Sequence, residues 1–150
     1  MIDQRFVGWQ LPAVPVDVER GRLRFFADVI GETDPVYRDV AAARAAGHPD
    51  LPVPPTFFFT LNLESPNLFD EMGVDLRHVL HGEQQFTYHR MAHAGESFTL
   101  HSRVADIYHK AGKGGMLEFI ATDTSVHDGA GGPVADLRSV TVVQHREAKP

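Results

Sequence analysis

The sequence contains no cysteine among its 150 residues. This absence excludes disulfide bonds, thiolate metal sites and a cysteine nucleophile, and it is typical of a cytoplasmic protein. No apolar run approaches the roughly 20 residues that a membrane-spanning helix needs. The first residues also lack the basic and apolar blocks of a signal peptide. We therefore expect a cytoplasmic protein that does not enter a membrane.

Positive charge is scarce as well, with 14 lysines and arginines against 20 acidic residues and a net charge of -6. Without a basic stripe to release counterions from phosphates, a nucleic-acid partner is not expected. None of the nine histidines forms a pair with metal-ligand spacing in a supporting context, so we expect neither a metal nor another cofactor. The length and the 43% hydrophobic content predict one domain over residues 1–150 with a full core.

Helical periodicity marks the first half of the chain. Asp17 is the predicted N-cap of a helix that ends at Gly31. Shorter helices are expected at 39–46, where Asp39 caps an alanine run, and at 67–73. The apolar residues of the first helix recur at helical spacing and are expected to be buried: Leu23, Phe26, Val29 and Ile30.

A proline-rich segment, residues 51–56, precedes a second helical pattern. Its prolines forbid a helix until the last of them, Pro55, which suits a first helical turn because its missing N–H would be unpaired there. We expect the helix to end at Ser65-Pro66 and, being apolar nearly all round, to be buried on most sides. Its apolar residues are Phe57, Phe58, Phe59, Leu61 and Leu63.

From about residue 78 the hydrophobic period changes to two, which is typical of half-buried strands. Glycine-rich segments at 111–115 and 128–133 predict hairpins. The residues expected to face the core are Phe98, Leu100 and Val104 in one strand, Leu117, Phe119 and Ala121 in the next, and Val140 and Val142 in the last.

An antiparallel meander of about four strands, preceded by an apolar helix, predicts an α+β architecture in which a curved sheet wraps around a buried central helix. That arrangement is the hotdog fold. Because its edge strands would otherwise be exposed, we expect the sheet to pair edge to edge in a dimer.

Three stretches resemble the MaoC-like family of dehydratases and (R)-specific enoyl-CoA hydratases. Residues 26–39, FADVIGETDPVYRD, are similar to the hydratase signature, which in active members is Gly-Asp-x-Asn-Pro-x-His-x-Asp. Residues 53–57, VPPTF, stand where active members open the central helix. Residues 81–90 with Gly95-Glu96 are similar to the strand and turn that follow. The likeness covers nearly the whole chain.

Within the family, the chain is most similar to the FAS1-type, or MaoC N-terminal-type, dehydratase domain. That subgroup includes the non-catalytic subunit of the mycobacterial 3-hydroxyacyl-carrier-protein dehydratase. The resemblance implies reversible, (R)-specific addition of water to a 2-enoyl thioester carried on CoA or acyl carrier protein. Such a reaction needs an acid and a base, because water loses a proton while the alpha carbon gains one. Active members use an Asp and a His.

Carried over from the family signature, the Asp falls on Glu32, the Asn on Asp34 and the His on Tyr37. A phenol, with an ordinary pKa of about 10, is poorly matched to proton transfer at neutral pH. His81 is an alternative base if the start of its strand meets the loop at Glu32. The alternatives are that Asp34 simply bonds its own backbone in a turn and that His81 is an ordinary strand-end residue.

The substrate-binding residues implied by the resemblance open the central helix: Pro55, Thr56, Phe57 and Phe58. In active members a backbone N–H here stabilises the thioester oxygen as negative charge develops. The helix-opening glycine of those members falls near Pro55, which has no N–H, so Thr56 or Phe57 would have to donate. The phenylalanines either line an acyl tunnel or belong to the core alone.

Two functions therefore compete. In the first, the chain is a homodimeric (R)-specific 3-hydroxyacyl-thioester dehydratase or 2-enoyl-thioester hydratase that uses Glu32 or Asp34 with Tyr37 or His81. In the second, it is a non-catalytic acyl-binding subunit of a heterodimer, and another MaoC-like chain carries the intact Asp and His. A thioesterase-like hotdog protein is the third possibility, although the proline-containing segments fit the dehydratase branch better.

Overall fold

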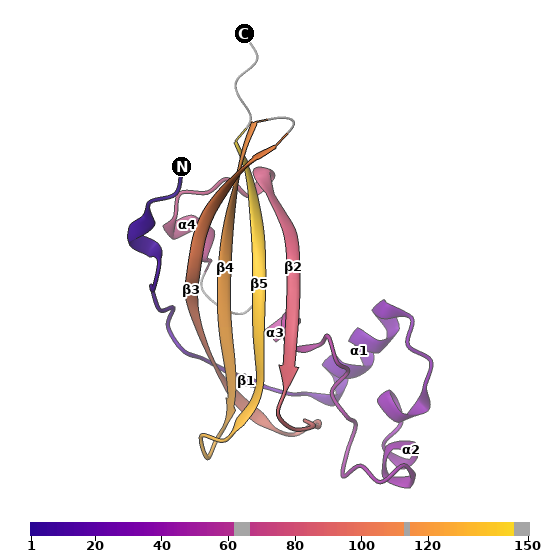
Figure 1. Cartoon of the computed structure of the whole chain (residues 1–150). Helices are drawn as coiled ribbons and strands as arrows, with labels where there is room; N and C mark the ends of the chain where they lie inside the picture. The colour runs from indigo at the N-terminus through magenta and orange to yellow at the C-terminus, as the bar shows by residue number, and fades with distance from the viewer. Residues whose placement is uncertain (62–66, 113–114, 146–150) are drawn as a thin grey trace.

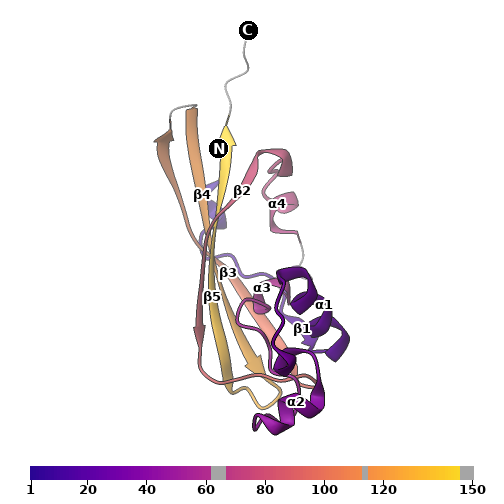
Figure 2. The same ribbon diagram turned by 90° about the vertical axis from the view of Figure 1, so that its right-hand side faces the viewer.

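A curved, five-stranded antiparallel sheet forms the body of the protein, with the strand order β1-β3-β4-β5-β2. The computed structural model describes residues 1–61, 67–112 and 115–145. Helices α1 to α4 all lie on one side of the sheet (Figure 2), as the predicted hotdog fold requires. The strands are β1 (Val14–Asp17), β2 (Val79–Tyr88), β3 (Ser97–Gly112), β4 (Gly115–Asp128) and β5 (Pro133–His145).

The prediction of about four antiparallel strands after residue 78 is confirmed by β2 to β5, but their order is not that of a simple meander, and one strand in the first half was not predicted. β2 pairs with β5, from Val79↔Val143 to Tyr88↔Ala135, and not with β3, which follows it in sequence. The short β1 adds a fifth strand beside β3. Periodicity identifies a strand from its own residues, whereas the choice of neighbour depends on contacts far apart in sequence. The hairpins β3–β4 and β4–β5 are present as predicted.

The buried residues predicted for β3 are confirmed, as are Ala121 of β4 and Val140 of β5, but Leu117 and Phe119 of β4 are not fully buried. In β4 the fully buried positions are Glu118, Ile120, Thr124 and Val126, while Leu117 and Phe119 are half-buried on the opposite face. Polar residues occupy inward positions because each has a partner there. Hydropathy alone cannot reveal such partners. The prediction for β4 therefore assigned the wrong alternating residues, Leu117 and Phe119, to the face that packs against the helices.

Helix α1 (Arg20–Ile30) ends at Gly31, whose φ of 73° is left-handed, as predicted for a C-terminal glycine. Asp17 is not its N-cap: it is the last residue of β1, and the cap position is Glu19, which makes no side-chain cap hydrogen bond. Val18 between them stays extended because its N–H bonds the Glu96 carbonyl at 2.9 Å.

The buried stripe of α1 is narrower than the sequence predicted. Leu23 is fully buried and Phe26 half-buried, but Val29 and Ile30 are 65% and 50% exposed. The fully buried residues of the helix are Leu23 and Ala27, which lie four residues apart on one face. Val29 lies off that face, and Ile30 is the last residue of the helix, beyond the buried pair. The predicted burial of Val29 and Ile30 was therefore wrong in the isolated chain.

The other helices are short. Asp39 caps α2 (Val40–Ala45) by accepting from the Ala42 N–H at 2.8 Å, as predicted, and Asn67 caps α4 (Leu68–Glu71). The central helix is described as α3 (Phe58–Leu61); its predicted continuation to Leu63 and its end at Ser65-Pro66 lie outside the described residues. Single 3-10 turns are η1 (Gln4–Phe6), η2 (Pro35–Tyr37) and η4 (Leu76–His78).

Two hydrophobic clusters fill the concave side of the sheet. The larger one surrounds the central helix, where Phe57, Phe58 and Leu61 are buried against Phe98 and Leu100 of β3. This burial agrees with the prediction of a helix enclosed on most sides. No helix in the described part of the chain is long and apolar enough to cross a membrane.

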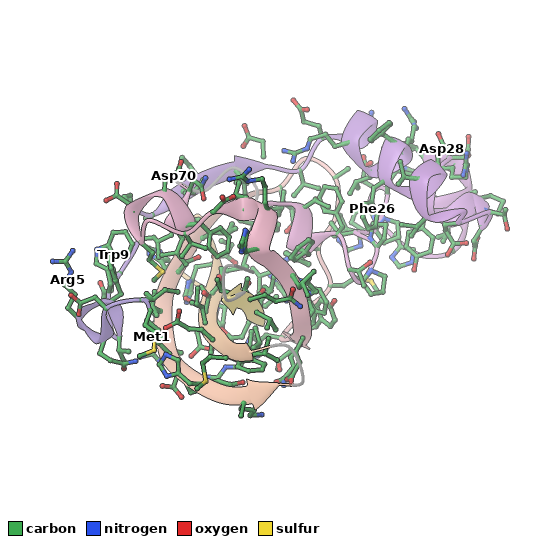
Figure 3. The ribbon with its side chains drawn as sticks, turned by 90° about the horizontal axis from the view of Figure 1, so that it is seen from above. Met1, Arg5, Trp9, Phe26, Asp28 and Asp70 are labelled. Carbon is green, nitrogen blue, oxygen red and sulfur yellow. The ribbon has the colours of Figure 1, made fainter. Side chains whose placement is uncertain are left out.

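The smaller cluster lies near the N-terminal segment, which runs along the edge of β3. Figure 3 shows Met1, Arg5 and Trp9 on one side of the molecule, and Phe26 and Asp28 of α1 on the other. The buried carboxylate of Glu118 accepts from the Ile2 N–H at 2.9 Å and lies 2.7 Å from His109 Nε2. These bonds fix the first residues of the chain to the sheet.

Candidate functional site

The loop that carries the signature, residues 31–39, connects α1 to α2 and is called the signature loop below. Its two candidate carboxylates both bond the backbone of the loop itself. Glu32 Oε1 accepts from the Asp34 N–H at 2.9 Å. Asp34 Oδ1 accepts from the Val36 N–H at 2.9 Å and caps η2. Asp34 therefore bonds the backbone of its own turn, which is the arrangement that the sequence offered as the alternative to a catalytic role.

Arginines tie the signature loop to α1. Arg38 donates to the Glu32 carbonyl at 2.6 Å and forms an ion pair with Asp28 of α1. Arg24 of α1 donates to the Arg38 carbonyl at 2.9 Å. Tyr37 is half-buried in the same loop, and its hydroxyl has no hydrogen-bond partner among the described residues. The loop is thus held in one conformation by contacts that do not involve a ligand.

The structure does not bring His81 to the signature loop. His81 is the third residue of β2, and β2 begins at the end of the sheet away from α1 and α2 (Figure 1). Its ring packs edge-on against Phe59, with 5.2 Å between ring centroids. Within the described ranges, no hydrogen bond or ion pair links it to Glu32 or Tyr37. The condition under which His81 would serve as the base is not met within this chain.

The opening of the central helix offers fewer N–H donors than expected. The Phe57 N–H bonds the Pro54 carbonyl at 3.0 Å, so it is already used. Thr56 is exposed, and the N–H groups of Thr56 and Phe58 are the backbone donors at this opening that have no partner among the described residues. Phe57 and Phe58 are each only 2% exposed, so they belong to the core, and Phe58 also lines a pocket.

This pocket, called the helix-opening pocket below, has a volume of about 270 Å³ and mostly apolar walls. The Tyr88 hydroxyl donates to the Pro55 carbonyl on its rim. The Tyr88 ring stacks on Phe86, with centroids 5.9 Å apart, and lies 6.0 Å from Phe58. Burial raises the pKa of Tyr88. The lining residues are Val53, Pro55, Phe58, Tyr88, His89, Arg90, Met91 and Ala92.

The side chains of His89 and Arg90 in this pocket already have carboxylate partners. His89 Nε2 lies 2.6 Å from a carboxylate oxygen of Asp136. Arg90 donates to Glu96 at 2.8 Å and approaches Asp128 at 3.3 Å. Sequence reasoning placed residues 81–90 only in a strand and missed Tyr88 and His89 as pocket residues. The signal was the alternation of β2, which turns Phe86 and Tyr88 to the helix side.

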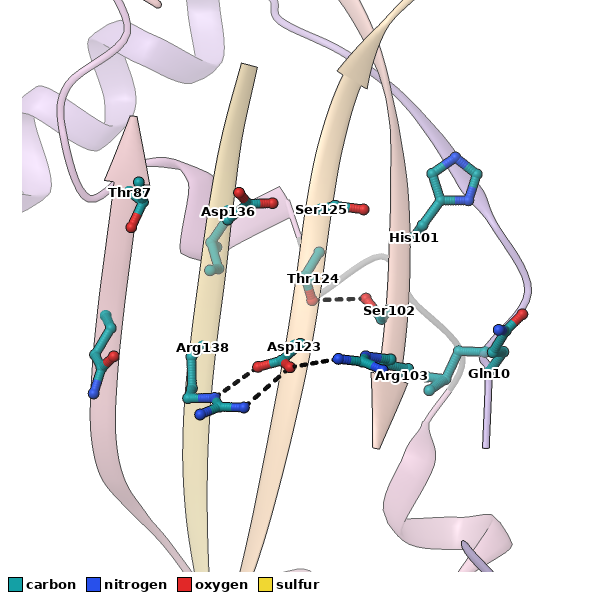
Figure 4. Close-up of a pocket in the computed structure, with 13 residues that line it drawn as sticks. Gln10, Thr87, His101, Ser102, Arg103, Asp123, Thr124, Ser125, Asp136 and Arg138 are labelled. Carbon is teal, nitrogen blue, oxygen red and sulfur yellow. Dashed lines mark hydrogen bonds and ion pairs between the residues drawn. The ribbon is translucent and has the colours of Figure 1, made fainter. Parts of the chain in front are cut away.

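A wide polar hollow of about 710 Å³ lies on the face of the sheet turned away from the helices (Figure 4). There Arg138 and Arg103 both bond the carboxylate of Asp123, at 2.7 and 3.3 Å for the nearest atoms. None of the candidate residues predicted from the sequence lines this hollow. Its polar floor is unsuited to an acyl chain, so the helix-opening pocket is the better candidate site.

Comparison with known proteins agrees with this architecture. The family model described as the FAS1-like dehydratase domain region matches residues 5–137. A UPF0336 protein of Streptomyces coelicolor is 37% identical over 134 residues, covering 87% of each chain. A UPF0336 protein of Saccharopolyspora erythraea is 33% identical over 153 residues, covering 99% of this chain and 96% of its own.

Solved structures of two complexes share the fold. The ChsH1-ChsH2 complex of Mycobacterium tuberculosis matches with a TM-score of 0.73 at 25% identity, over 94% of this chain and 87% of that one. The HadBC (3R)-hydroxyacyl-ACP dehydratase complex of the same organism gives a TM-score of 0.79 at 19% identity, over 91% and 96%. At 19% identity the second match is one of fold alone.

Proposed function

Because this chain belongs to the family of the FAS1-like dehydratase domain region, we propose that it is the acyl-thioester-binding, non-catalytic subunit of a MaoC-like dehydratase. A partner MaoC-like chain would carry the intact Asp and His. The substrate class is a 3-hydroxyacyl or 2-enoyl thioester of CoA or acyl carrier protein. The partner would perform the proton transfers, and this chain would hold the acyl group.

The observation that carries the proposal is the geometry of the signature loop. Hydration needs an acid and a base within hydrogen-bond reach of the same substrate. Here the carboxylates of Glu32 and Asp34 accept from backbone N–H groups of their own turn. No imidazole in the described part of the chain bonds either of them, and Tyr37 stands in place of the signature His. The loop is built as a structural turn.

The binding role is supported by the helix-opening pocket. Its apolar walls lie at the start of a buried helix, and burial of an acyl chain there would be favourable by about 0.8 kcal/mol for each CH₂ group. Met91, which is 60% exposed, forms part of the rim. An acyl chain that covers Met91 removes an apolar surface from water as well.

The need for a partner is supported by the free edge of the sheet. Among the described strands, the ten-residue β2 lies at one edge of the sheet and pairs only with β5. Long unpaired edges with apolar side chains promote pairing with another chain, and Leu80 on this strand is 51% exposed. β2 ends at Tyr88, which lines the helix-opening pocket. A partner chain paired along β2 would therefore lie close to the bound acyl group.

One observation favours the alternative of a self-sufficient hydratase. Glu32 keeps a carboxylate at the position of the signature Asp, and a homodimer would bring two copies of β2 together. Enoyl-thioester hydration by the chain alone would support this alternative.

Binding of octanoyl-CoA to the purified chain, measured by calorimetry, tests the proposed role. Octanoyl-CoA is saturated and can be neither hydrated nor dehydrated, so the assay measures binding alone. We expect binding that is weakened by about an order of magnitude in Met91→Ser through loss of apolar contact. Met116→Ser is the matched control, because Met116 is also exposed but does not line the pocket. Failure of the chain to bind acyl-CoA, both alone and with a MaoC-like partner, would contradict the proposal.

A further inference from the structure

We propose that the Tyr88 hydroxyl is the donor that binds the thioester carbonyl of the acyl ligand, replacing the N–H that Pro55 lacks. This inference rests on the proposed acyl-binding function and adds a residue role to it. It follows from where Tyr88 lies, from which other donors are already used, and from the chemistry of a neutral phenol in an apolar pocket.

The position of Tyr88 is defined by contacts on three sides. Its hydroxyl reaches the Pro55 carbonyl at the first turn of the central helix. Tyr88 is 43% exposed, and the covered part of its ring packs against Phe86 and Phe58, with ring centroids 5.9 and 6.0 Å away. The hydroxyl is therefore fixed at the rim of the helix-opening pocket, beside the point where the resemblance puts the thioester oxygen. A donor held in this way loses little side-chain entropy on binding.

The other donors around the pocket are less suitable. Pro55 has no N–H, and the Phe57 N–H already bonds the Pro54 carbonyl. Phe58 is only 2% exposed, so its N–H is less accessible to a ligand than the Tyr88 hydroxyl. The Thr56 N–H belongs to the peptide whose carbonyl Tyr88 contacts. That peptide is trans, like all described ones, so its N–H points away from the Tyr88 side. A carbonyl beside Tyr88 is therefore out of reach of the Thr56 N–H.

The charged donors of the pocket are held by carboxylates. Arg90 bonds Glu96 and Asp128, and His89 is paired with Asp136. Moving either toward a ligand would leave a carboxylate without its partner. Tyr88 gives up only a bond to a backbone carbonyl, which is open to water at the exposed rim.

The phenol also suits the ligand chemically. Burial raises the pKa of Tyr88, so the hydroxyl remains protonated, and hence a donor, through the neutral range. Rotation about its C–O bond redirects the proton from the Pro55 carbonyl to a ligand carbonyl. A thioester oxygen is a neutral acceptor, and a hydrogen bond to it is stronger between apolar walls than in water.

Two ligands and two tyrosine variants test the assignment. Octanoyl-CoA is compared with S-octyl-CoA, a thioether that has the same chain without the carbonyl, by calorimetry on the wild-type chain and Tyr88→Phe. We expect the wild type to prefer the thioester about fivefold, the effect of one neutral hydrogen bond, and Tyr88→Phe to bind both ligands equally. Tyr108→Phe is the matched control, because Tyr108 stacks on Phe119 and does not line the pocket.

The comparison of ligands separates a binding role from a structural one. Loss of the Pro55 contact alone would weaken both ligands equally and leave the fivefold preference, which would overturn the inference. The same holds if Tyr37→Phe, and not Tyr88→Phe, removes the preference. Equal binding of both ligands by the wild type would overturn this inference but leave the acyl-binding function standing. Binding of neither ligand would overturn both. If Tyr88→Phe does not fold, Tyr88→Leu replaces it.

Discussion

Replacement of Asp34 by asparagine and by alanine distinguishes a turn-forming residue from a catalytic one. Asp34 Oδ1 accepts from the Val36 N–H at 2.9 Å and caps the 3-10 turn η2. Asparagine caps about as well as aspartate, whereas alanine forfeits the bond at a cost of about 1 kcal/mol. For a domain of this length, that cost lowers the melting temperature by about 3 °C. Asp34→Asn should therefore melt like the wild type, and Asp34→Ala should not.

The assay combines thermal unfolding of the isolated chain with hydration of crotonyl-CoA by its complex with a catalytic MaoC-like partner. We expect Asp34→Asn to retain wild-type turnover in the complex, because the bond to Val36 needs only an oxygen acceptor. A catalytic carboxylate would behave in the opposite way. A more than tenfold loss of turnover in Asp34→Asn, with an unchanged melting temperature, would refute the structural role of Asp34.

Further predictions concern the stability of the fold. Glu118→Ala leaves the partly buried His109 without its carboxylate and should lower the free energy of unfolding by about 3 kcal/mol, measured by urea denaturation; an unchanged midpoint would contradict this. Burial lowers the pKa of His93 below its ordinary 6.5, so the unfolded chain takes up this proton more readily than the folded one. The neutral His93 side chain therefore contributes its full stability above about pH 6.5, and this contribution is lost as the pH falls below that value. The urea midpoints at about pH 7.5 and about pH 5 should differ less in His93→Gln than in the wild type. Gly82→Ala would put a methyl carbon 2.9 Å from the Val140 carbonyl oxygen; the shift this forces should cost about 1–3 kcal/mol, measured by thermal unfolding, whereas a wild-type melting temperature would show that β2 adjusts freely.

Features set by neighbouring residues could be predicted from the sequence. The end of α1 at Gly31 and the cap of α2 at Asp39 depend on local backbone preferences, and both are present. The buried central helix followed from its apolar residues on all sides. The pairing of β2 with β5 could not be predicted, because it joins residues that are distant in sequence, from Val79↔Val143 to Tyr88↔Ala135, through contacts that leave no local pattern.

The same distinction applies to the site. The resemblance identified the signature loop and the helix opening, but not how their groups are used. Only the structure shows that the Asp34 carboxylate accepts from the Val36 N–H and that the Phe57 N–H already donates to the Pro54 carbonyl. Tyr88 was missed because its role depends on the Pro55 carbonyl, which comes from a segment 33 residues away in sequence.

The most direct test of the central claim is hydration of crotonyl-CoA and of a longer trans-2-enoyl-CoA by the purified chain, alone and with a MaoC-like partner that carries the intact signature. We predict no turnover by the chain alone and faster hydration of the longer substrate when the chain is added to the partner. Turnover by the chain alone, lost in Glu32→Gln, would contradict the claim that this subunit binds the acyl group without catalysing its hydration.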